Sequence, residues 1–334
     1  MHLVDSDTTT RDRLREGLCL PIAPIAATDG QFDPHRQRTL WRYYATAGTG
    51  GAVVDLTSGS AELRRELLAS LVAMPEKHDY HPWLRIPLVA EAEALATAVE
   101  LKESGVQAIA VALDDANAGS CDDLVGLLQA VGRSAPLIVY PAAYASPRFS
   151  TIEAWRRVLE IPQLCAICLP AQRPIAVMIM RALMETRRKD IGVYTANEIN
   201  PVIDLVTPFR YANDNKTIER RVVGGMLRLW GAFTARAVEL LERCHIVGER
   251  GAIPDELLQV SVEVTEMALA LSAESGGGLR VVLCRNKILA DNRGLEGKRL
   301  SDETLDRVAK TLKDHPHLTD FAYVAARLET WNGE

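Results

Sequence analysis

Residues that can bind anions stand directly after one short apolar run of this sequence. Thr57, Ser58 and Gly59 follow GAVVDL (51–56) and precede a predicted helix. Two hydroxyls and free backbone N–H groups at a helix N-terminus form a binding place for a carboxylate or a phosphate. An ordinary helix cap has the same composition, so both interpretations stay open.

A tyrosine ends another apolar run, PLIVY (136–140). The phenol of Tyr140 can both donate and accept a proton, which makes it a candidate acid/base group. The alternative is a core tyrosine whose hydroxyl is hydrogen-bonded to the backbone.

Acidic residues follow several further apolar runs. Carboxylates that converge can bind a hard cation or sugar hydroxyls, whereas solvated loop acids and helix caps are the plainer interpretation. The acids considered for such a site are Glu91, Asp114, Asp115 and Glu198, and the other polar candidates at strand ends are Asp55, Glu93, Tyr144, Arg148, Cys168 and Asn197.

Other spacings that suggest chemistry are weak. Cys165 and Cys168 form a C-x-x-C pattern on a predicted buried strand. Residues three apart on a strand point to opposite faces, which argues against a redox or zinc role. The histidine pairs 78/81 and 315/317 have no nearby Cys or His partners and are expected in surface loops.

The elements that position these residues alternate regularly between strand and helix. Residues 136–170 show one unit: a strand ending at Tyr140, a helix capped by Ser150 that runs to about Glu160, and the uniformly apolar strand Cys165–Leu169. A strand without alternation is typical of a parallel sheet covered on both faces. The other strands are expected at 18–26, 51–57, 86–92, 108–114, 191–197 and 222–227.

Eight such alternations predict a (β/α)8 TIM barrel, of the α/β class, with a C-terminal helical extension. An open doubly wound sheet is disfavoured because no G-x-G-x-x-G follows any strand. We expect a frayed N-terminal arm at 1–16, the barrel at 17–244, and a helical region at 245–334 packed on the barrel. Residues 211–221 are expected to form an irregular polar insertion. In this fold, functional residues lie at the C-terminal ends of the strands.

Composition limits the functional class. The chain has 334 residues, of which 48% are hydrophobic and 25% charged, with a formal net charge of −6 and dispersed Lys and Arg. These values predict a large core and argue against nucleic-acid binding. No signal peptide or membrane-spanning run is expected, and six cysteines are too few for a disulfide scaffold, so a cytoplasmic location is expected.

The order of these pieces resembles the dihydrodipicolinate synthase and N-acetylneuraminate lyase family. The resemblance covers roughly residues 17–315 and lies in LCLPIAPIAATDGQFD (18–33), VVDLTSGSAEL (53–63), PLIVY (136–140) and KILADNRGLEGKRLSDE (287–303). It implies a barrel with a C-terminal helical region and a homo-oligomer, dimer or tetramer. It also implies a class I aldolase that holds pyruvate or a related 2-oxo acid as a lysine Schiff base.

The resemblance gives roles to some positions and removes others. Thr57, Ser58 and Gly59 are similar to the family's carboxylate-binding stretch, and Tyr140 to its proton-relay tyrosine. Cys168 stands where the family has the Schiff-base lysine, and a thiol cannot form an imine.

Three more departures lie around the implied site. Ser60 replaces the family's glutamate, and the loop DDANAGS (114–120) lacks the tyrosine that neighbouring subunits contribute. Arg148 is a displaced substitute for the family's arginine. Asn197 and Glu198 stand near a position that contacts the polar end of the substrate.

Three interpretations follow. The first is a lyase or aldolase-like enzyme that acts on a small 2-oxo acid or sugar-derived substrate, carboxylate-bearing or polyhydroxylated, without the lysine imine. It needs no organic cofactor and has no assigned metal ligands, although a divalent metal is kept as an alternative electron sink. The second is a non-catalytic member that binds a small molecule or a partner, and the third lets Lys216 replace the missing lysine.

Overall fold

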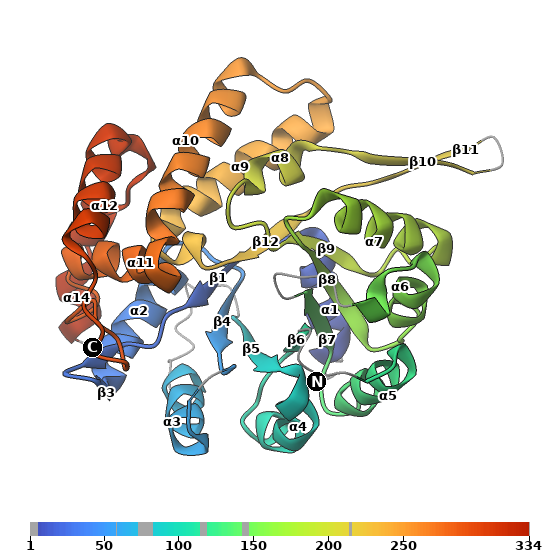
Figure 1. Cartoon of the computed structure of the whole chain (residues 1–334), viewed down its shortest axis with the longest axis horizontal. Helices are drawn as coiled ribbons and strands as arrows, with labels where there is room; N and C mark the ends of the chain where they lie inside the picture. The colour runs from blue at the N-terminus through green and yellow to red at the C-terminus, as the bar shows by residue number, and fades with distance from the viewer. Residues whose placement is uncertain are drawn as a thin grey trace, which may run out of the picture.

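The computed structural model describes residues 6–57, 59–72, 83–113, 119–141, 147–213 and 216–333. Parallel strands close into an eight-stranded barrel, with helices alternating around its outside (Figure 1). The predicted (β/α)8 barrel is therefore confirmed. Its strands, in the order in which they neighbour one another, are β1 (Cys19–Ala23), β12 (Gly224–Leu227), β9 (Gly192–Thr195), β8 (Leu164–Leu169), β7 (Leu137–Pro141), β6 (Ile109–Leu113), β5 (Leu84–Ala90) and β4 (Gly51–Asp55).

The barrel helices follow their strands in chain order. Asp33 accepts a hydrogen bond from the N–H of Arg36 and caps the first of them, with Pro34 at the first helical position. Thr151, rather than the expected Ser150, caps the helix after β7. The helices are α2 (Pro34–Thr46), α3 (Ala61–Val72), α4 (Ala94–Glu103), α5 (Cys121–Val131), α6 (Ile152–Leu159), α7 (Arg173–Thr186), α8 (Pro201–Val206) and α9 (Thr234–Arg250), and short 3₁₀ turns are η1 (Glu91–Glu93), η2 (Pro147–Phe149) and η3 (Leu229–Gly231).

Two apolar clusters hold the barrel together. The larger lies between the strands and the surrounding helices, and the smaller fills the inside of the barrel. All residues of β8 are buried, as expected for a strand that contacts both clusters. Inward-facing residues of the smaller cluster include Ile22, Val53, Ile138, Tyr194 and Met226.

The N-terminal segment closes the bottom of the barrel. The expected frayed arm is instead helix α1 (Ser6–Glu16), which contacts β8 and β9. Leu14 is fully buried, and its carbonyl accepts a hydrogen bond from the hydroxyl of Tyr194 at 2.8 Å. At Gly192 a Cβ atom would lie 2.2 Å from the carbonyl oxygen of Leu14, so the close approach of this helix requires glycine there.

The expected irregular insertion is a regular hairpin. Strands β10 (Phe209–Asn213) and β11 (Lys216–Arg220) pair antiparallel, and the hairpin projects away from the barrel (Figure 1). Tyr211 and Ile218 lie opposite each other in the register and pack against the large cluster, an arrangement that the polar composition did not indicate. Lys216 lies at the outer end of the hairpin, opposite Asn213 in the register, which does not bring it to the barrel mouth.

The C-terminal region packs on the barrel through α2 and α8, and Asp320 also joins it to α9. Asp320 is buried and accepts hydrogen bonds from the hydroxyl of Tyr43 at 2.6 Å and from the N–H groups of Ala235 and Arg236 at the start of α9. The region consists of α10 (Asp255–Leu271), α11 (Ala273–Arg285), α12 (Asp302–Asp314), η4 (Pro316–Leu318), α13 (Phe321–Ala325) and α14 (Leu328–Gly333), and a small hairpin, β2 (Ala27–Thr28) with β3 (Gln31–Phe32), precedes α2.

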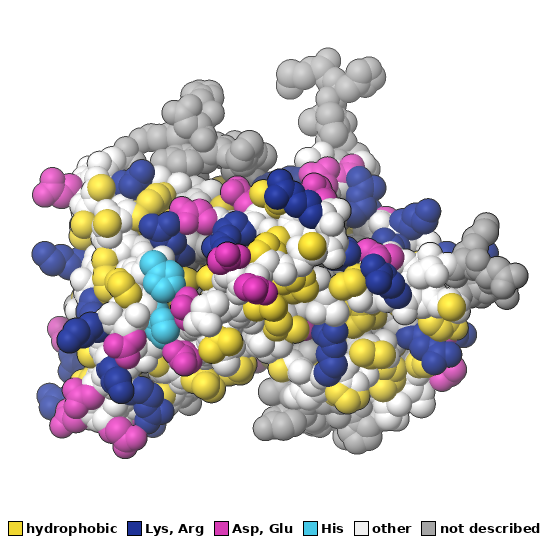
Figure 2. Space-filling view, turned by 90° about the horizontal axis from the view of Figure 1, so that it is seen from above, with side chains coloured by type: hydrophobic (Ala, Val, Ile, Leu, Met, Phe, Trp, Pro, Cys, Tyr) yellow, Lys and Arg dark blue, Asp and Glu magenta, His cyan; other side chains and the backbone are white. Residues whose placement is uncertain are grey.

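Charges of both signs are interspersed on the surface. Figure 2 shows Lys and Arg mixed with Asp and Glu over one face, with histidine side chains beside acidic ones. The rings of His315 and His317 lie 6.3 Å apart. Their Nε2 atoms lie 2.7 Å and 2.8 Å from the carboxylates of Glu266 and Glu263, so each histidine is hydrogen-bonded to an acidic side chain of α10. His78 and His81 lie outside the described residues.

Within the described ranges, no single helix is both long and apolar enough to span a membrane. One bent pair, Asp255–Leu271 with Gly276–Arg285, reaches the required length and composition only together, and its members meet at 96°.

Candidate active site

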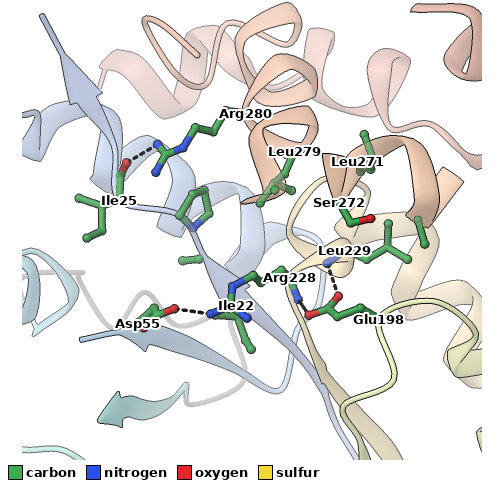
Figure 3. A pocket seen from close by; sticks show the side chains of 14 residues that line it. Ile22, Ile25, Asp55, Glu198, Arg228, Leu229, Leu271, Ser272, Leu279 and Arg280 are labelled. Atoms are coloured by element: carbon green, nitrogen blue, oxygen red, sulfur yellow. Dashed lines mark hydrogen bonds and ion pairs between the residues drawn. The ribbon is translucent and has the colours of Figure 1, made fainter. Parts of the chain in front are cut away.

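Charged side chains meet at the C-terminal ends of β4 and β12. Asp55 follows Val53 on the inward face of β4, and Arg228 follows Met226 in the same way after β12. The Nη2 of Arg228 donates to Oδ2 of Asp55 at 2.6 Å, which joins the two strand ends (Figure 3).

A second acid, Glu198 in the loop after β9, binds the backbone at the same arginine. Its carboxylate accepts hydrogen bonds from the N–H of Arg228 at 2.7 Å and from the N–H of Leu229 at 3.0 Å. These are the otherwise unsatisfied donors at the start of η3. Glu198 therefore fixes the turn from which the side chain of Arg228 reaches Asp55.

These groups line a cavity of about 450 Å³ at the mouth of the barrel. This volume lies within the range of about 300–1,000 Å³ that is usual for small-molecule sites. Helices α10 and α11 cover one side of the cavity, so the C-terminal region completes the site (Figure 3). The walls include Ile22, Asp55, Glu198 and Arg228 from the barrel and Leu271, Ser272, Leu279 and Arg280 from the two helices.

Tyr140 lies inside the barrel beneath these charges, with 8% of its surface exposed. Burial raises the pKa of its phenol well above the usual value, and the negative charges of Glu198 and Asp55 act in the same direction, against the opposing effect of Arg228. Tyr140 therefore keeps its proton at neutral pH, and it can act as a hydrogen-bond donor and an acid.

Cys168 is fully buried beside Tyr140 in the interior cluster. Burial raises the pKa of its thiol, so the thiol stays protonated at neutral pH. Cys165 is also buried, and both thiols are free. Where the chain is described, no lysine lies on a strand of the barrel.

The charged residues of the site also modify one another. Burial raises the pKa of Glu198, and the two backbone donors and Arg228 offset part of that rise. Burial lowers the pKa of Arg228, but the negative charge of Asp55 and the neighbouring Tyr140 and Glu198 outweigh it, so that the pKa is raised. A carboxyl group with a raised pKa is a better base near neutral pH.

The predicted anion-binding stretch supports Asp55. The hydroxyl and the N–H of Thr57 both donate to Oδ1 of Asp55, at 2.5 Å and 3.1 Å. Gly59 has a φ of +103°, and the hydroxyl of Ser60 then accepts from the N–H of Leu63 in the first turn of α3. Ser58 lies outside the described residues.

Two residues that were predicted to bind the substrate make structural contacts instead. The side-chain oxygen of Asn197 accepts from the N–H groups of Ile199 and Asn200, and its amide donates to the carbonyl of Asn200, so it organises the loop after β9. Arg148 forms a two-pronged ion pair with Glu91 at 2.8 Å and 2.5 Å, in which the side chains are 7% and 5% exposed.

The acids considered as metal ligands do not gather in the described part of the chain. There, no group of three or more His, Cys, Asp or Glu side chains is placed to share a metal ion. Glu91 is occupied by Arg148, while Asp114, Asp115 and Tyr144 belong to the ranges that are not described.

Sequence reasoning missed Arg228 and Arg280. Arg228 directly follows the predicted strand 222–227, so the rule that functional residues stand at strand ends could have found it. Arg280 had no such signal, because it reaches the cavity from α11, a helix of the C-terminal region that does not follow a barrel strand.

Comparisons with known proteins connect this architecture to one group of solved structures. No family model and no curated protein matches the chain. The chain is similar in structure to a chloride-inhibited dihydrodipicolinate synthase from Acinetobacter baumannii in complex with pyruvate, with a TM-score of 0.69, 15% identity, and coverage of 90% of this chain and 98% of that one. It is similar to a catalytic lysine mutant of Ruminococcus gnavus sialic acid aldolase, with a TM-score of 0.72, 14% identity, and coverage of 91% and 97%.

A third similar structure bears on assembly. It is described as a monomeric dihydrodipicolinate synthase variant, with a TM-score of 0.69, 13% identity, and coverage of 91% and 99%. At these identities the likeness establishes the fold: a closed parallel barrel of the kind found in dihydrodipicolinate synthases and sialic acid aldolases. This fold accommodates a monomer as well as the dimer or tetramer that the sequence resemblance implies.

Proposed function

We propose that this protein is an aldolase-type lyase that acts on a small hydroxylated 2-oxo acid or a sugar-derived acid without a lysine Schiff base. The observation that carries the proposal is the linked set of charges, Asp55, Arg228 and Glu198, in the wall of a cavity of about 450 Å³. The protonated Tyr140 is buried inside the barrel, close enough to these charges for them to shift its pKa. The aldolase-type enzymes among the similar structures support the reaction class, and the absence of lysine from the described barrel strands supports a route without an imine.

Arg228 binds the 2-oxo acid end of the substrate in this proposal. Its guanidinium has five donors, and Asp55 engages Nη2, which leaves donors for a carboxylate and the adjacent carbonyl oxygen. Thr57 keeps Asp55 in place, so the pair is oriented before the substrate arrives. Such preorganised donors are the usual source of electrostatic stabilisation in enzymes.

The reaction is a carbon–carbon cleavage of a 4-hydroxy-2-oxo acid. Glu198 removes the proton from the C4 hydroxyl, and the C3–C4 bond breaks to leave an aldehyde. The electron pair of that bond forms an enolate whose oxygen is stabilised by Arg228 and the phenol of Tyr140. Glu198 then gives the proton that it took up to C3 of the enolate, which releases the shorter 2-oxo acid and restores the carboxylate. We further propose that no organic cofactor takes part, that the protein is cytoplasmic and that it forms a homo-oligomer.

The test compares Tyr140→Phe with the wild type in a screen of 4-hydroxy-2-oxo acids, with release of the 2-oxo acid as the readout. Removal of one hydrogen-bond donor to a developing oxyanion costs about 10²–10³-fold, so kcat/KM should fall by roughly that factor. Cys168→Ser is the matched control from the same interior cluster and should keep most of the activity. Unchanged kcat/KM in Tyr140→Phe would refute the role of Tyr140.

The same screen separates the enzyme from a non-catalytic binding protein. A non-catalytic member would show a rise in melting temperature with a 2-oxo acid but no product, since binding to the native state alone stabilises it. Repetition with added divalent ions and with a chelator tests the alternative in which a metal serves as the electron sink.

A further inference from the structure

The cavity contains a second arginine, Arg280, on α11. Figure 3 shows it entering from the C-terminal helices, on the side of the cavity away from Asp55 and Glu198. The proposed reaction gives this residue no task, although its charged group stands in the wall of the site.

The guanidinium of Arg280 is fixed in position. Its Nη1 donates to the carbonyl of Ile25 at 2.8 Å. Its flat face lies on Gly294, where a Cβ atom would approach Cζ to 2.8 Å and both terminal nitrogens to 3.1 Å. Gly294 has a φ of +66°, and any side chain there would displace the guanidinium as well as strain the turn.

The charge of Arg280 is uncompensated at close range. Arg228 is paired with Asp55 and Arg148 with Glu91, whereas no described carboxylate lies within ion-pair distance of Arg280. Burial lowers the pKa of Arg280, although an arginine stays protonated at neutral pH. A partly buried cation without a counter-charge is unfavourable, and an anion in the cavity would relieve that cost.

Arg280 also has donors to offer. One of its five N–H groups is used by the carbonyl of Ile25, and this neutral acceptor does not balance the charge. The negative charges of Asp291 and Glu296 raise the pKa of Arg280 through space, without an ion pair, and Asp291 is paired with Arg293. The remaining donors therefore suit a planar or tetrahedral anionic group.

We propose that Arg280 binds a second acidic group of the ligand, so that the preferred substrates are small diacids. Their 2-oxo acid end lies at Arg228, and the other end carries a carboxylate or a phosphate-type group at Arg280. The orientation rests on the proposed function, but the second anion site does not, because binding can be measured without turnover.

The test measures binding of four probes to the wild-type protein by calorimetry. The probes are 2-oxoglutarate, 2-oxoglutaramate, in which an amide replaces the distal carboxylate, and 2-oxopentanoate, which has no distal acid. Phosphonopyruvate is the probe for a phosphate-type distal group. A hydrogen bond to a charged group in a protein site corresponds to about ten- to hundredfold in affinity. We expect at least tenfold tighter binding of one diacid than of the two probes without a distal charge. A wild-type protein that shows no such preference for either diacid overturns the proposal.

The variant Arg280→Gln assigns the preference to this residue. It should bind the diacid no better than 2-oxopentanoate, with its affinity for 2-oxopentanoate unchanged. Arg285→Gln is the matched control, since Arg285 is an exposed arginine of the same helix. A diacid preference that survives in Arg280→Gln overturns the assignment. If Arg280→Gln does not fold, Arg280→Lys should keep the preference in weakened form, and the wild-type series decides in any case.

The outcome also separates this inference from the proposed function. Tyr140→Phe should keep the wild-type ratio of affinities for the diacid and for 2-oxopentanoate, whether or not the wild type turns the diacid over. Diacid preference without turnover would therefore refute the lyase and keep the anion site. Turnover without diacid preference would refute the anion site at Arg280 and keep the lyase.

Discussion

The ion pair between Glu91 and Arg148 provides a quantitative test of how the structure assigns Arg148. The resemblance makes Arg148 a substrate-binding residue, whereas the structure places it in a buried, two-pronged pair at 2.8 Å and 2.5 Å. The two side chains are 7% and 5% exposed. Solvent screening is therefore weak, and removal of one partner breaks a buried ion pair from one side.

The magnitude follows from the burial. Breaking a buried pair from one side costs about 3–5 kcal/mol, whereas replacing both partners is often close to neutral. At about 2.1 cal/mol/K per residue, the unfolding entropy of a chain of this length is roughly 0.7 kcal/mol/K. Glu91→Gln alone and Arg148→Met alone should therefore lower the melting temperature by about 4–7 °C, and the double variant should recover most of that loss.

The assay is thermal unfolding of the two single variants and the double variant, with 2-oxo acid binding measured on each folded protein. Arg307→Met is the control, because its pair with Glu303 is exposed at 49% and 83% and should contribute less than about 1 kcal/mol. An Arg148→Met protein with unchanged stability and lost ligand binding would refute the structural role. In that case Arg148 would be the substrate-binding residue that the resemblance implies.

Two further predictions concern charges at opposite ends of the barrel. Asp55→Asn should lower affinity for 2-oxo acids about tenfold, because it removes the charge that orients Arg228, and calorimetry should show this with little change in melting temperature. At the bottom, hydrogen bonds from Arg188 lower the pKa of Asp190 to about 2. Since the folded pKa lies below the unfolded value of about 3.9, the stability from this pair is present above that value and is lost as pH falls toward 2. Asp190→Asn should therefore flatten the melting temperature between pH 5 and pH 2, by a small amount because the carboxylate is 39% exposed, and an unchanged slope would contradict it.

The barrel could be predicted from the sequence because its signals are local. Apolar runs such as Cys165–Leu169 and the Asp33-Pro34 helix start are typical of buried parallel strands and of helix caps. Tyr140 was located because it ends such a run. Helix α1 was missed because Leu14 is the single apolar residue in SDTTTRDRLRE, so its burial depends on the rest of the barrel.

The site was predicted only where it lies next to a strand end. Asp55 and Glu198 were found in this way, and their partners were not. The pairing of Arg148 with Glu91 joins residues 57 positions apart, and Arg280 reaches Ile25 across 255 positions. Contacts over such separations depend on how loops and helices pack, and no local pattern records them.

The same reason explains the hairpin β10–β11. Residues 211–221 are largely polar, so they gave no strand signal beyond a short alternation. Tyr211 finds its place only against α7, where Arg181 lies over its ring at 5.2 Å. Tertiary contact therefore decided a structure that the local composition left open.

The central claim is that this barrel performs its chemistry without a lysine imine. The most direct test is intact-mass measurement after incubation with pyruvate and borohydride, with a lysine-dependent sialic acid aldolase as the positive control. The account predicts no adduct on this chain while the control gains one pyruvate. A stable adduct would contradict the account, and peptide mapping would then identify the lysine that forms it.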